Sequence, residues 1–133
     1  MVFADTSGFI AAFDSRDSGH AAAARAFRSI AKTGQPVVTT DLVLSETLTH
    51  LRRRGGWEPS KRAGDAILGS RAFQIVCADR DSLEAGYREF IRNADPKLSL
   101  CDAHSFVVMR DRGITRALTF DRHFADAGFV ILG

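Results

Sequence analysis

The sequence predicts a single α/β domain, a three-layer α/β/α sandwich around a parallel sheet of about five strands. Two observations carry this prediction. Short runs rich in β-branched and aromatic residues alternate with longer segments of helical period, and the runs are apolar throughout instead of alternating with polar residues. Such strands are typical of a parallel sheet covered by helices on both faces. A length of 133 residues, of which 45% are hydrophobic, suits one domain with one core.

The predicted elements follow in chain order. Strands are expected at the apolar runs, residues 2–4, 36–40, 73–78, 117–120 and 129–132. Helices are expected in the segments between them, residues 7–13, 21–32, 42–53, 59–69, 82–94 and 100–112. Gly34, Gly69, Gly113 and Gly128 each stand where a helix would end before a strand, a position that favours a glycine C-cap.

The net charge is small, because 18 Lys and Arg face 16 Asp and Glu and leave +2. A chain of this kind does not hold nucleic acid by overall charge alone. It begins without the basic region of a signal peptide, and no stretch approaches the roughly 20 apolar residues of a membrane span. Cys77 and Cys101 lack metal-binding or CxxC spacing, which predicts reduced, packed thiols. We therefore expect a cytoplasmic protein with no membrane segment.

Aspartates gather at the predicted strand ends. Four of the five strands are followed at once by an aspartate, at Asp5, Asp41, Asp79 and Asp121. The carboxyl ends of parallel strands share one edge of a sheet, where ligands bind. Aspartate is also a favoured helix N-cap, and we interpret Asp41 and Asp79 as caps because helical segments follow them directly. Asp5, which precedes small polar residues, and Asp121, which precedes a sharp turn, are the better site candidates.

Two further acids lie inside predicted helices. In one helix Leu44, Leu48 and Leu51 form an apolar stripe and Glu46 faces away from it, which suits either a site residue or a solvated glutamate. In the last long helix Asp102 stands three residues after Ser99, the spacing of a capping box. Asp102 also shares its face with apolar residues one and two turns later, which predicts burial. A buried carboxylate needs a partner, since burying an unpaired charge is costly.

Four segments, taken in order, resemble the PIN-domain fold and, more narrowly, the VapC-type ribonuclease toxins of bacterial type II toxin–antitoxin pairs. They are Asp5-Thr6-Ser7, Glu46 in its helix, Leu98-Ser99-Leu100-Cys101-Asp102-Ala103 and Leu118-Thr119-Phe120-Asp121-Arg122-His123-Phe124. The resemblance spans almost the whole chain and implies one PIN-like nuclease domain over residues 1–133. It implies an acidic quartet of Asp5, Glu46, Asp102 and Asp121, with Ser7 supporting the first acid.

Carboxylates gathered in one crevice repel one another, and a divalent cation removes that conflict. Mg²⁺, or Mn²⁺ as a substitute, prefers such oxygen ligands and can activate water for phosphodiester hydrolysis. The hypothesis is therefore a metal-dependent endoribonuclease, a hydrolase acting on RNA. Asp5 and Asp102 are expected to be the most direct metal ligands, with Glu46 and Asp121 completing the site directly or through water.

Positive charge outside the crevice would have to meet the RNA backbone. Removing the four site acids leaves 18 bases against 12 acids, or +6 for the rest of the chain. Arg53, on the Glu46 face, and Arg122, next to Asp121, are expected to bind substrate, although arginines near helix ends also interact with the helix dipole. The resemblance further implies a cognate antitoxin protein that blocks the crevice and a second copy of the chain in a homodimer.

Other readings of the same pattern are weaker. A phosphoacceptor receiver domain needs an acid pair after the first strand, but Thr6 and Ser7 follow Asp5. A haloacid dehalogenase phosphatase needs Asp-x-Asp there, and position 7 is Ser. The histidines show no zinc-binding spacing, and His123 alone adjoins a site acid. A non-enzymatic, receiver-like regulatory or binding module that uses the same acidic crevice remains the alternative function.

Overall fold

The computed structural model describes residues 1–133 and contains one five-stranded, wholly parallel sheet. The strand order is β3-β2-β1-β4-β5, so the first strand lies at the centre. The strands are β1 (Val2–Ala4), β2 (Val37–Thr40), β3 (Phe73–Val76), β4 (Arg116–Leu118) and β5 (Val130–Ile131). The predicted fold class is confirmed: β1 has the predicted bounds, and each of the other four strands is one or two residues shorter than predicted.

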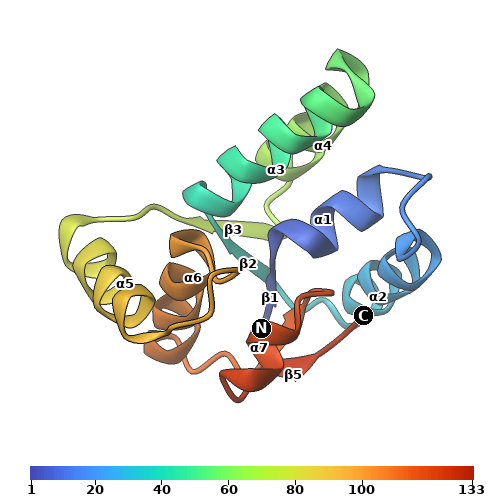
Figure 1. Ribbon diagram of the computed structural model, residues 1–133. Helices are drawn as coiled ribbons and strands as arrows, with labels where there is room; N and C mark the ends of the chain where they lie inside the picture. The colour runs from blue at the N-terminus through green and yellow to red at the C-terminus, as the bar shows by residue number, and fades with distance from the viewer.

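Seven helices cover the two faces of this sheet (Figure 1). One layer holds α1 (Thr6–Phe13), α2 (His20–Thr33), α3 (Asp41–Gly55) and α4 (Trp57–Gly69). The other holds α5 (Arg80–Arg92), α6 (Leu100–Asp111) and α7 (Arg122–Asp126). The chain steps outward from β1 to β3 and then returns past β1 to β4, so right-handed crossovers place the early and late helices on opposite faces. The short helix α7, of five residues, was not predicted from the sequence.

The core on each side of the sheet is built around phenylalanines. Phe9, Phe27 and Phe73 contact one another with ring centroids 5.7 to 6.3 Å apart. On the α6 and α7 side, Phe106 and Phe124 meet edge to face at 4.9 Å. These contacts bury the apolar stripes of the helices against the strands and so hold the helix that carries Asp102 against the sheet. None of the helices is long and apolar enough to cross a membrane.

Gly8 lets α1 lie close to the end of β4. A Cβ at this position would stand 2.3 Å from the backbone oxygen of Leu118, so no larger residue fits without displacement. The close approach brings Asp5 and Ser7, at the start of α1, beside Thr119, which follows β4. A helix–strand contact of this kind cannot be recognised from local sequence alone.

Three local predictions were wrong. Asp41 is not the cap of α3, because the side chain of Thr40 accepts from Val43 instead; Asp41 Oδ1 accepts from the backbone N of Ala78 at 3.0 Å and ties β2 to the end of β3. Gly69 is the last residue of α4 and does not have a positive φ, since the helix ends in extended backbone at Ser70. Cys77 is exposed, because β3 ends before it.

The other predicted caps are present. Asp79 caps α5, and Ser82 returns a hydrogen bond to its backbone. Gly34, Gly113 and Gly128 have φ of 66°, 65° and 96°, the left-handed conformation in which a side chain is strained.

Candidate active site

Asp5 is the N-cap of α1 and is buried at the carboxyl end of the central strand. One oxygen, Oδ2, accepts hydrogen bonds from Ser7 Oγ and Thr119 Oγ1, both at 3.0 Å. The same two hydroxyls accept from backbone N–H groups of the next loop, Ser7 Oγ from Phe120 at 2.9 Å and Thr119 Oγ1 from Asp121 at 3.0 Å. These hydrogen bonds thus connect Asp5 to the loop that carries Asp121.

The second oxygen of Asp5, Oδ1, is buried and has no hydrogen-bond partner. Burial, together with the negative charge of Asp102, raises the pKa of Asp5 to about 6; the backbone N–H of Thr6 and the hydroxyls of Ser7 and Thr119 act in the opposite direction. A buried anionic oxygen without a donor is costly. A cation bound at Oδ1 would remove that cost, and the atom is therefore placed as a metal ligand would be.

Asp102 lies in the first turn of α6 and is almost fully buried. Its Oδ2 accepts from the backbone N of Ser99 at 3.0 Å, and its own N–H donates to Ser99 Oγ, which completes the predicted capping box. Burial raises the pKa of Asp102, and the charges of Asp121 and Glu46 raise it further. The three carboxylates are therefore close enough for their charges to act on one another.

Asp121 caps α7 and is linked to a histidine that the sequence analysis did not assign to the site. Oδ1 of Asp121 accepts from the backbone N of His123 at 2.9 Å and lies 2.6 Å from Nδ1 of the same residue. Nε2 of His123 lies 2.8 Å from Oδ2 of Asp95, in the connection between α5 and α6. These hydrogen bonds to Asp95 and Asp121 raise the pKa of His123.

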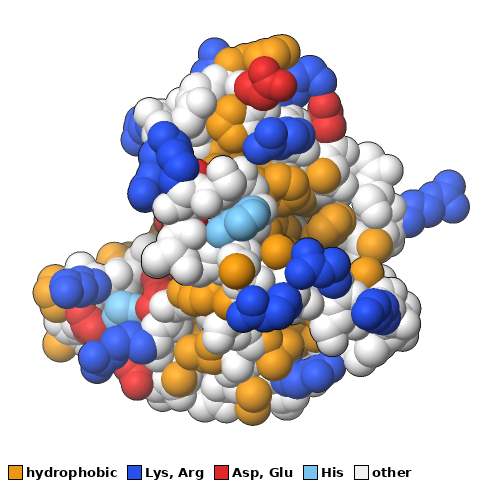
Figure 2. Space-filling view, turned by 90° about the vertical axis from the view of Figure 1, so that its right-hand side faces the viewer, with side chains coloured by type: hydrophobic (Ala, Val, Ile, Leu, Met, Phe, Trp, Pro, Cys, Tyr) orange, Lys and Arg blue, Asp and Glu red, His pale blue; other side chains and the backbone are white.

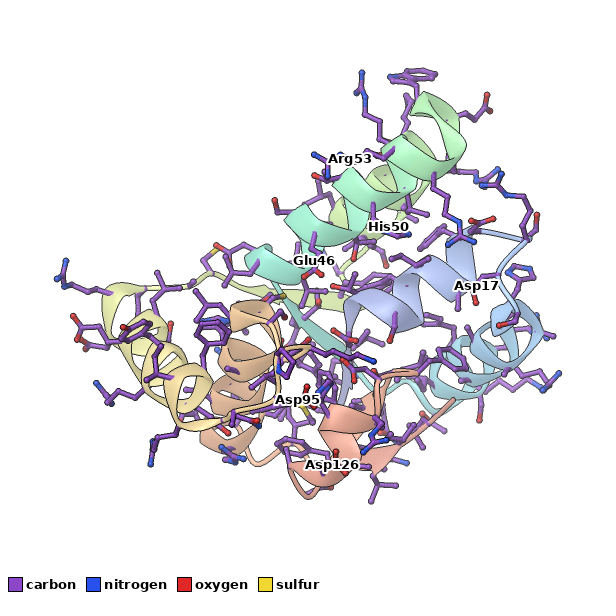
Figure 3. The ribbon with its side chains drawn as sticks, in the orientation of Figure 1. Asp17, Glu46, His50, Arg53, Asp95 and Asp126 are labelled. Carbon is purple, nitrogen blue, oxygen red and sulfur yellow. The ribbon has the colours of Figure 1, made fainter.

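Glu46 approaches the cluster from α3. It lines a hollow of about 440 Å³ together with Arg53, Leu100 and Cys101. Figure 3 shows Glu46 at the end of α3 near the sheet and Arg53 farther along the same helix. Burial raises the pKa of the Cys101 thiol, and the charges of Glu46, Asp5 and Asp102 raise it further, so Cys101 stays a neutral thiol and not a nucleophile.

The structure therefore brings all four predicted acids to one region. Possible ligand atoms of Asp102, Asp121 and His123 lie within 4.8 Å of one another. The charge of Asp102 raises the pKa of Asp5, and the charge of Glu46 raises the pKa of Asp102 and of Cys101. Asp5, Asp102 and Asp121 each use one oxygen for hydrogen bonds within the chain. The other oxygen of each is left for a cation, and this donor set of carboxylates suits a hard divalent ion.

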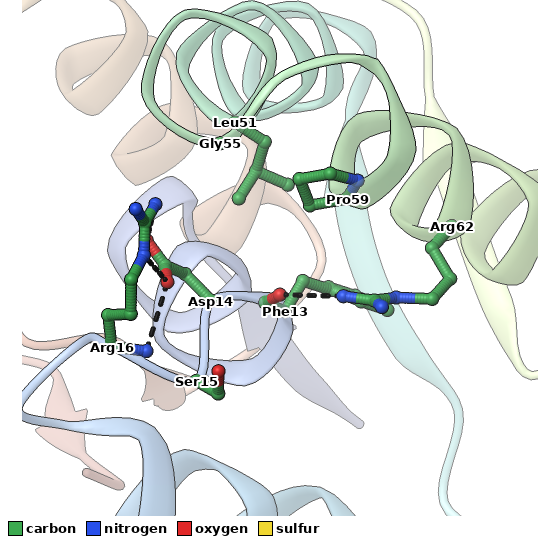
Figure 4. A pocket seen from close by; sticks show the side chains of 8 residues that line it. All are labelled: Phe13, Asp14, Ser15, Arg16, Leu51, Gly55, Pro59 and Arg62. Carbon is green, nitrogen blue, oxygen red and sulfur yellow. Dashed lines mark hydrogen bonds and ion pairs between the residues drawn. The ribbon is translucent and has the colours of Figure 1, made fainter.

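A second cluster of charged residues lies at the end of α1, and its members are paired within the chain (Figure 4). Asp14, buried at the end of α1, pairs with Arg16 at 3.0 Å and with Arg54 at 3.5 Å. Arg62 donates to the carbonyl of Phe13 at 3.3 Å. Because each of these groups is already paired within the chain, this cluster links α1 to α3 and α4. The sequence offered no sign of it beyond the Asp-x-Arg spacing.

On one face of the molecule the positive charge is divided among separate groups of side chains (Figure 2). On the face seen in Figure 2, Lys and Arg side chains stand among hydrophobic ones. Near the acids the available cations are particular residues: Arg53 in the Glu46 hollow, and Lys97 and Arg122 in another hollow beside Asp121.

A family model for the PIN domain matches residues 2–130. The chain belongs to the PIN-domain family. This confirms the family resemblance recognised in the sequence, and the match covers β1 to β4, the first residue of β5 and all four predicted acids.

Relatives of this PIN domain are similar over their full length. The chain is 37% identical over 131 residues to the 23S rRNA-specific endonuclease VapC20 of Mycobacterium tuberculosis, in both the CDC 1551 and the H37Rv strains, with 98% of this chain and 96% of the relative covered. The crystal structure of Mycobacterium tuberculosis VapC20, described as a Sarcin-Ricin loop cleaving toxin, aligns with a TM-score of 0.89 at 34% identity. That alignment covers 98% of this chain and 97% of the other.

Proposed function

We propose that this chain is a Mg²⁺-dependent endoribonuclease and the toxin component of a type II toxin–antitoxin module. The observation that carries the proposal is the unpartnered, buried Oδ1 of Asp5 beside the mutually repelling carboxylates of Asp102, Asp121 and Glu46. Its membership of a nuclease family and its likeness to a protein named as an endonuclease support the same reaction. A receiver-like module would need a second acid directly after Asp5, where this chain has Thr6 and Ser7.

Each acid has a distinct part in the proposed mechanism. Asp5 and Asp102, which are buried and anchored by Ser7 and Ser99, would hold the ion directly; Glu46 and Asp121 would complete the site directly or through water. The chemistry supplied by a bound Mg²⁺, for which Mn²⁺ can substitute, is activation of a water molecule and neutralisation of phosphate oxygens. A carboxylate of Glu46 or Asp121 that holds the ion through a water would be placed to accept a proton from that water.

The charges around the acids would position the RNA. Arg53 would meet the phosphodiester backbone on the Glu46 side, and Arg122 would do so on the Asp121 side. We propose 23S rRNA as the substrate, by analogy with the relative named for that specificity. A cognate antitoxin and a second copy of the chain are the proposed protein partners, by membership of the toxin family.

The test is cleavage of purified 23S rRNA and of a mixed RNA pool, with Mg²⁺ or Mn²⁺ and with a chelator. We expect cleavage with metal only, and a loss of about 100-fold or more in Asp5→Asn and Asp102→Asn. The matched control is Asp65→Asn, which removes an exposed carboxylate on α4 and should leave cleavage unchanged. Cleavage that persists in chelator, or in both site variants, would exclude a metal nuclease.

A further inference from the structure

A hollow of about 500 Å³ opens beside Asp121, and it shares no lining residue with the hollow of Glu46. Ser7, Asp121 and His123 form part of its wall, so it is continuous with the acidic site. A phosphodiester held at the acids would carry a nucleotide on either side. The hollow therefore stands where one of those nucleotides would lie.

Phe120 is the only hydrophobic residue among the seven that line this hollow, and its side chain is 41% exposed. Its backbone N donates to Ser7 Oγ, within the hydrogen-bond network that holds Asp5. The tip of its ring lies against Gly19 and Gly133, where a Cβ would stand 2.8 and 3.3 Å from ring carbons. The tip of the ring is thus packed against Gly19 and Gly133, while much of the residue stays open to solvent.

Two cations beside this ring are free to meet phosphate. Lys97 makes no ion pair, and Arg122 has only Asp126, at 3.7 Å, on a side chain that is 87% exposed. The acids of the same hollow, Asp95 and Asp121, are already engaged by His123. The positive charge of Lys97 and Arg122 is therefore not cancelled within the hollow.

A fixed, exposed aromatic ring flanked by cations is the combination that binds an unpaired nucleotide, because the base stacks on the ring and the phosphate meets the charges. A protein partner would favour a wider apolar patch, and the other lining residues are polar or charged. We propose that this hollow binds a nucleotide adjacent to the scissile phosphate, with its base stacked on Phe120 and its phosphate facing Lys97 and Arg122. The proposal rests on the proposed ribonuclease function and adds a substrate subsite to it.

A single-tryptophan variant tests the stacking directly. Trp57, on α4, is the only tryptophan in the chain and is exposed. The double variant Trp57→Phe and Phe120→Trp moves the indole into the hollow; Asp102→Asn is added to prevent cleavage. Titration with an RNA tetranucleotide in Mg²⁺ should quench the fluorescence by about half or more. The Asp102→Asn protein with its native Trp57 should show no quenching, nor should the double variant with an abasic tetranucleotide.

Binding and cleavage by otherwise native variants complete the test. Phe120→Ala should weaken RNA binding at least about fivefold, and Phe120→Trp should restore it. The matched control is Tyr87→Ala, which removes an exposed aromatic ring on α5. Circular dichroism and thermal melting check that each variant is folded.

Two results would overturn the subsite: no quenching in the tryptophan variant, or wild-type binding and cleavage by Phe120→Ala. The second result would also be expected if Phe120 served a protein contact instead. Failure of the ribonuclease function is separate, because it would appear as a wild-type protein that does not cleave RNA with metal. Quenching by the tetranucleotide would still report the subsite in that case.

Discussion

Nδ1 of His123 lies 2.6 Å from Oδ1 of Asp121, and the backbone N of His123 donates to the same oxygen. Both donors meet one oxygen, so the other oxygen of the carboxylate stays available to a cation. On the opposite side of the ring, Nε2 lies 2.8 Å from Asp95. His123 has a carboxylate at each ring nitrogen, and its hydrogen bonds to them raise its pKa, which favours the protonated form that donates to both. We therefore expect His123 to position Asp121 and not to bind the ion.

Substitution of His123 by Asn and by Gln tests its two side-chain hydrogen bonds one at a time. The amide nitrogen of Asn can take the place of Nδ1 and keep the bond to Asp121, whereas that of Gln can take the place of Nε2 and keep the bond to Asp95. We expect His123→Asn to cleave RNA within about threefold of wild type. His123→Gln and His123→Ala should lose about 10- to 100-fold, because Asp121 is no longer held in place.

The Mn²⁺ concentration dependence of activation and direct calorimetric titration with Mn²⁺ give the readouts for these variants. If His123 served only to hold the loop of Asp95 against α7, the order of the cleavage activities would be reversed, and His123→Gln would be more active than His123→Asn. Asp95→Asn, which keeps an acceptor for Nε2, should behave nearly as wild type.

Stability without metal should depend on pH through Asp5. Its pKa of about 6 in the folded protein is above the ordinary 3.8, so folding favours the protonated form. The stabilisation is complete below pH 4 and is lost as the pH rises through 6. Between pH 5 and 7.5 this group alone should lower the free energy of unfolding by about 1 to 2 kcal/mol in chelator.

Thermal melting of wild type and Asp5→Asn at both pH values isolates this contribution from that of other groups. Mg²⁺ should raise the melting temperature of wild type more at pH 7.5 than at pH 5, since the ion binds the ionised carboxylate. The variant should show a weaker pH trend and little response to Mg²⁺. Equal responses of the two proteins would mean that Asp5 is not a ligand.

Gly8→Ala should destabilise the fold by about 3 kcal/mol, because the added methyl group meets the backbone and side chain of Leu118 within 2.3 to 2.6 Å. Gly64→Ala, in the middle of α4, is the matched control: its methyl group would stand 3.6 Å from Leu48. Helix propensity predicts that this change stabilises by about 0.5 to 1 kcal/mol. Urea denaturation measures the free energy of unfolding of both variants. If Gly8→Ala were as stable as wild type, α1 could move away from Leu118 without cost, and the prediction would be wrong.

Arg53→Ala should raise the KM for RNA about three- to tenfold and leave kcat nearly unchanged, since Arg53 lines the Glu46 hollow without being one of the acids. The logarithmic dependence of binding on salt should lose about one unit of slope. Arg80→Ala removes an arginine that is 89% exposed on α5 and should alter neither value. An unchanged salt slope in Arg53→Ala would mean that Arg53 does not contact the RNA backbone.

The architecture could be predicted because its signals are local. Apolar runs, helical spacing and strand-end aspartates are properties of neighbouring residues. Because the strands of a parallel sheet run in one direction, their carboxyl ends lie at the same edge. Asp5 and Asp121 were predicted as site candidates by that reasoning. Asp102 was predicted from its place on an apolar helix face, although its capping-box spacing also fitted a purely structural role. Glu46 depended on the family resemblance, because a solvated glutamate gives the same pattern.

Other features depend on residues far apart in the sequence. The short helix α7 carries too few residues for a periodic pattern, and the role of Asp41 depends on Ala78, which is 37 positions away. His123 meets Asp95 across 28 positions, and the exposed ring of Phe120 rests on Gly19 and on the last residue of the chain. No local rule relates such pairs.

The sequence by itself determined the sheet, its helical layers and the placement of Asp5 and Asp121 at strand ends, since these follow from the hydrophobic period and from the order of the strands. Only the tertiary structure decided which oxygen of each acid is free, that His123 is held between two carboxylates, and that Phe120 stands open beside the site. The physical reason is that a hydrogen bond or a hollow belongs to groups brought together in space. Their distances are set by the packing of the helices on the sheet and not by spacing along the chain.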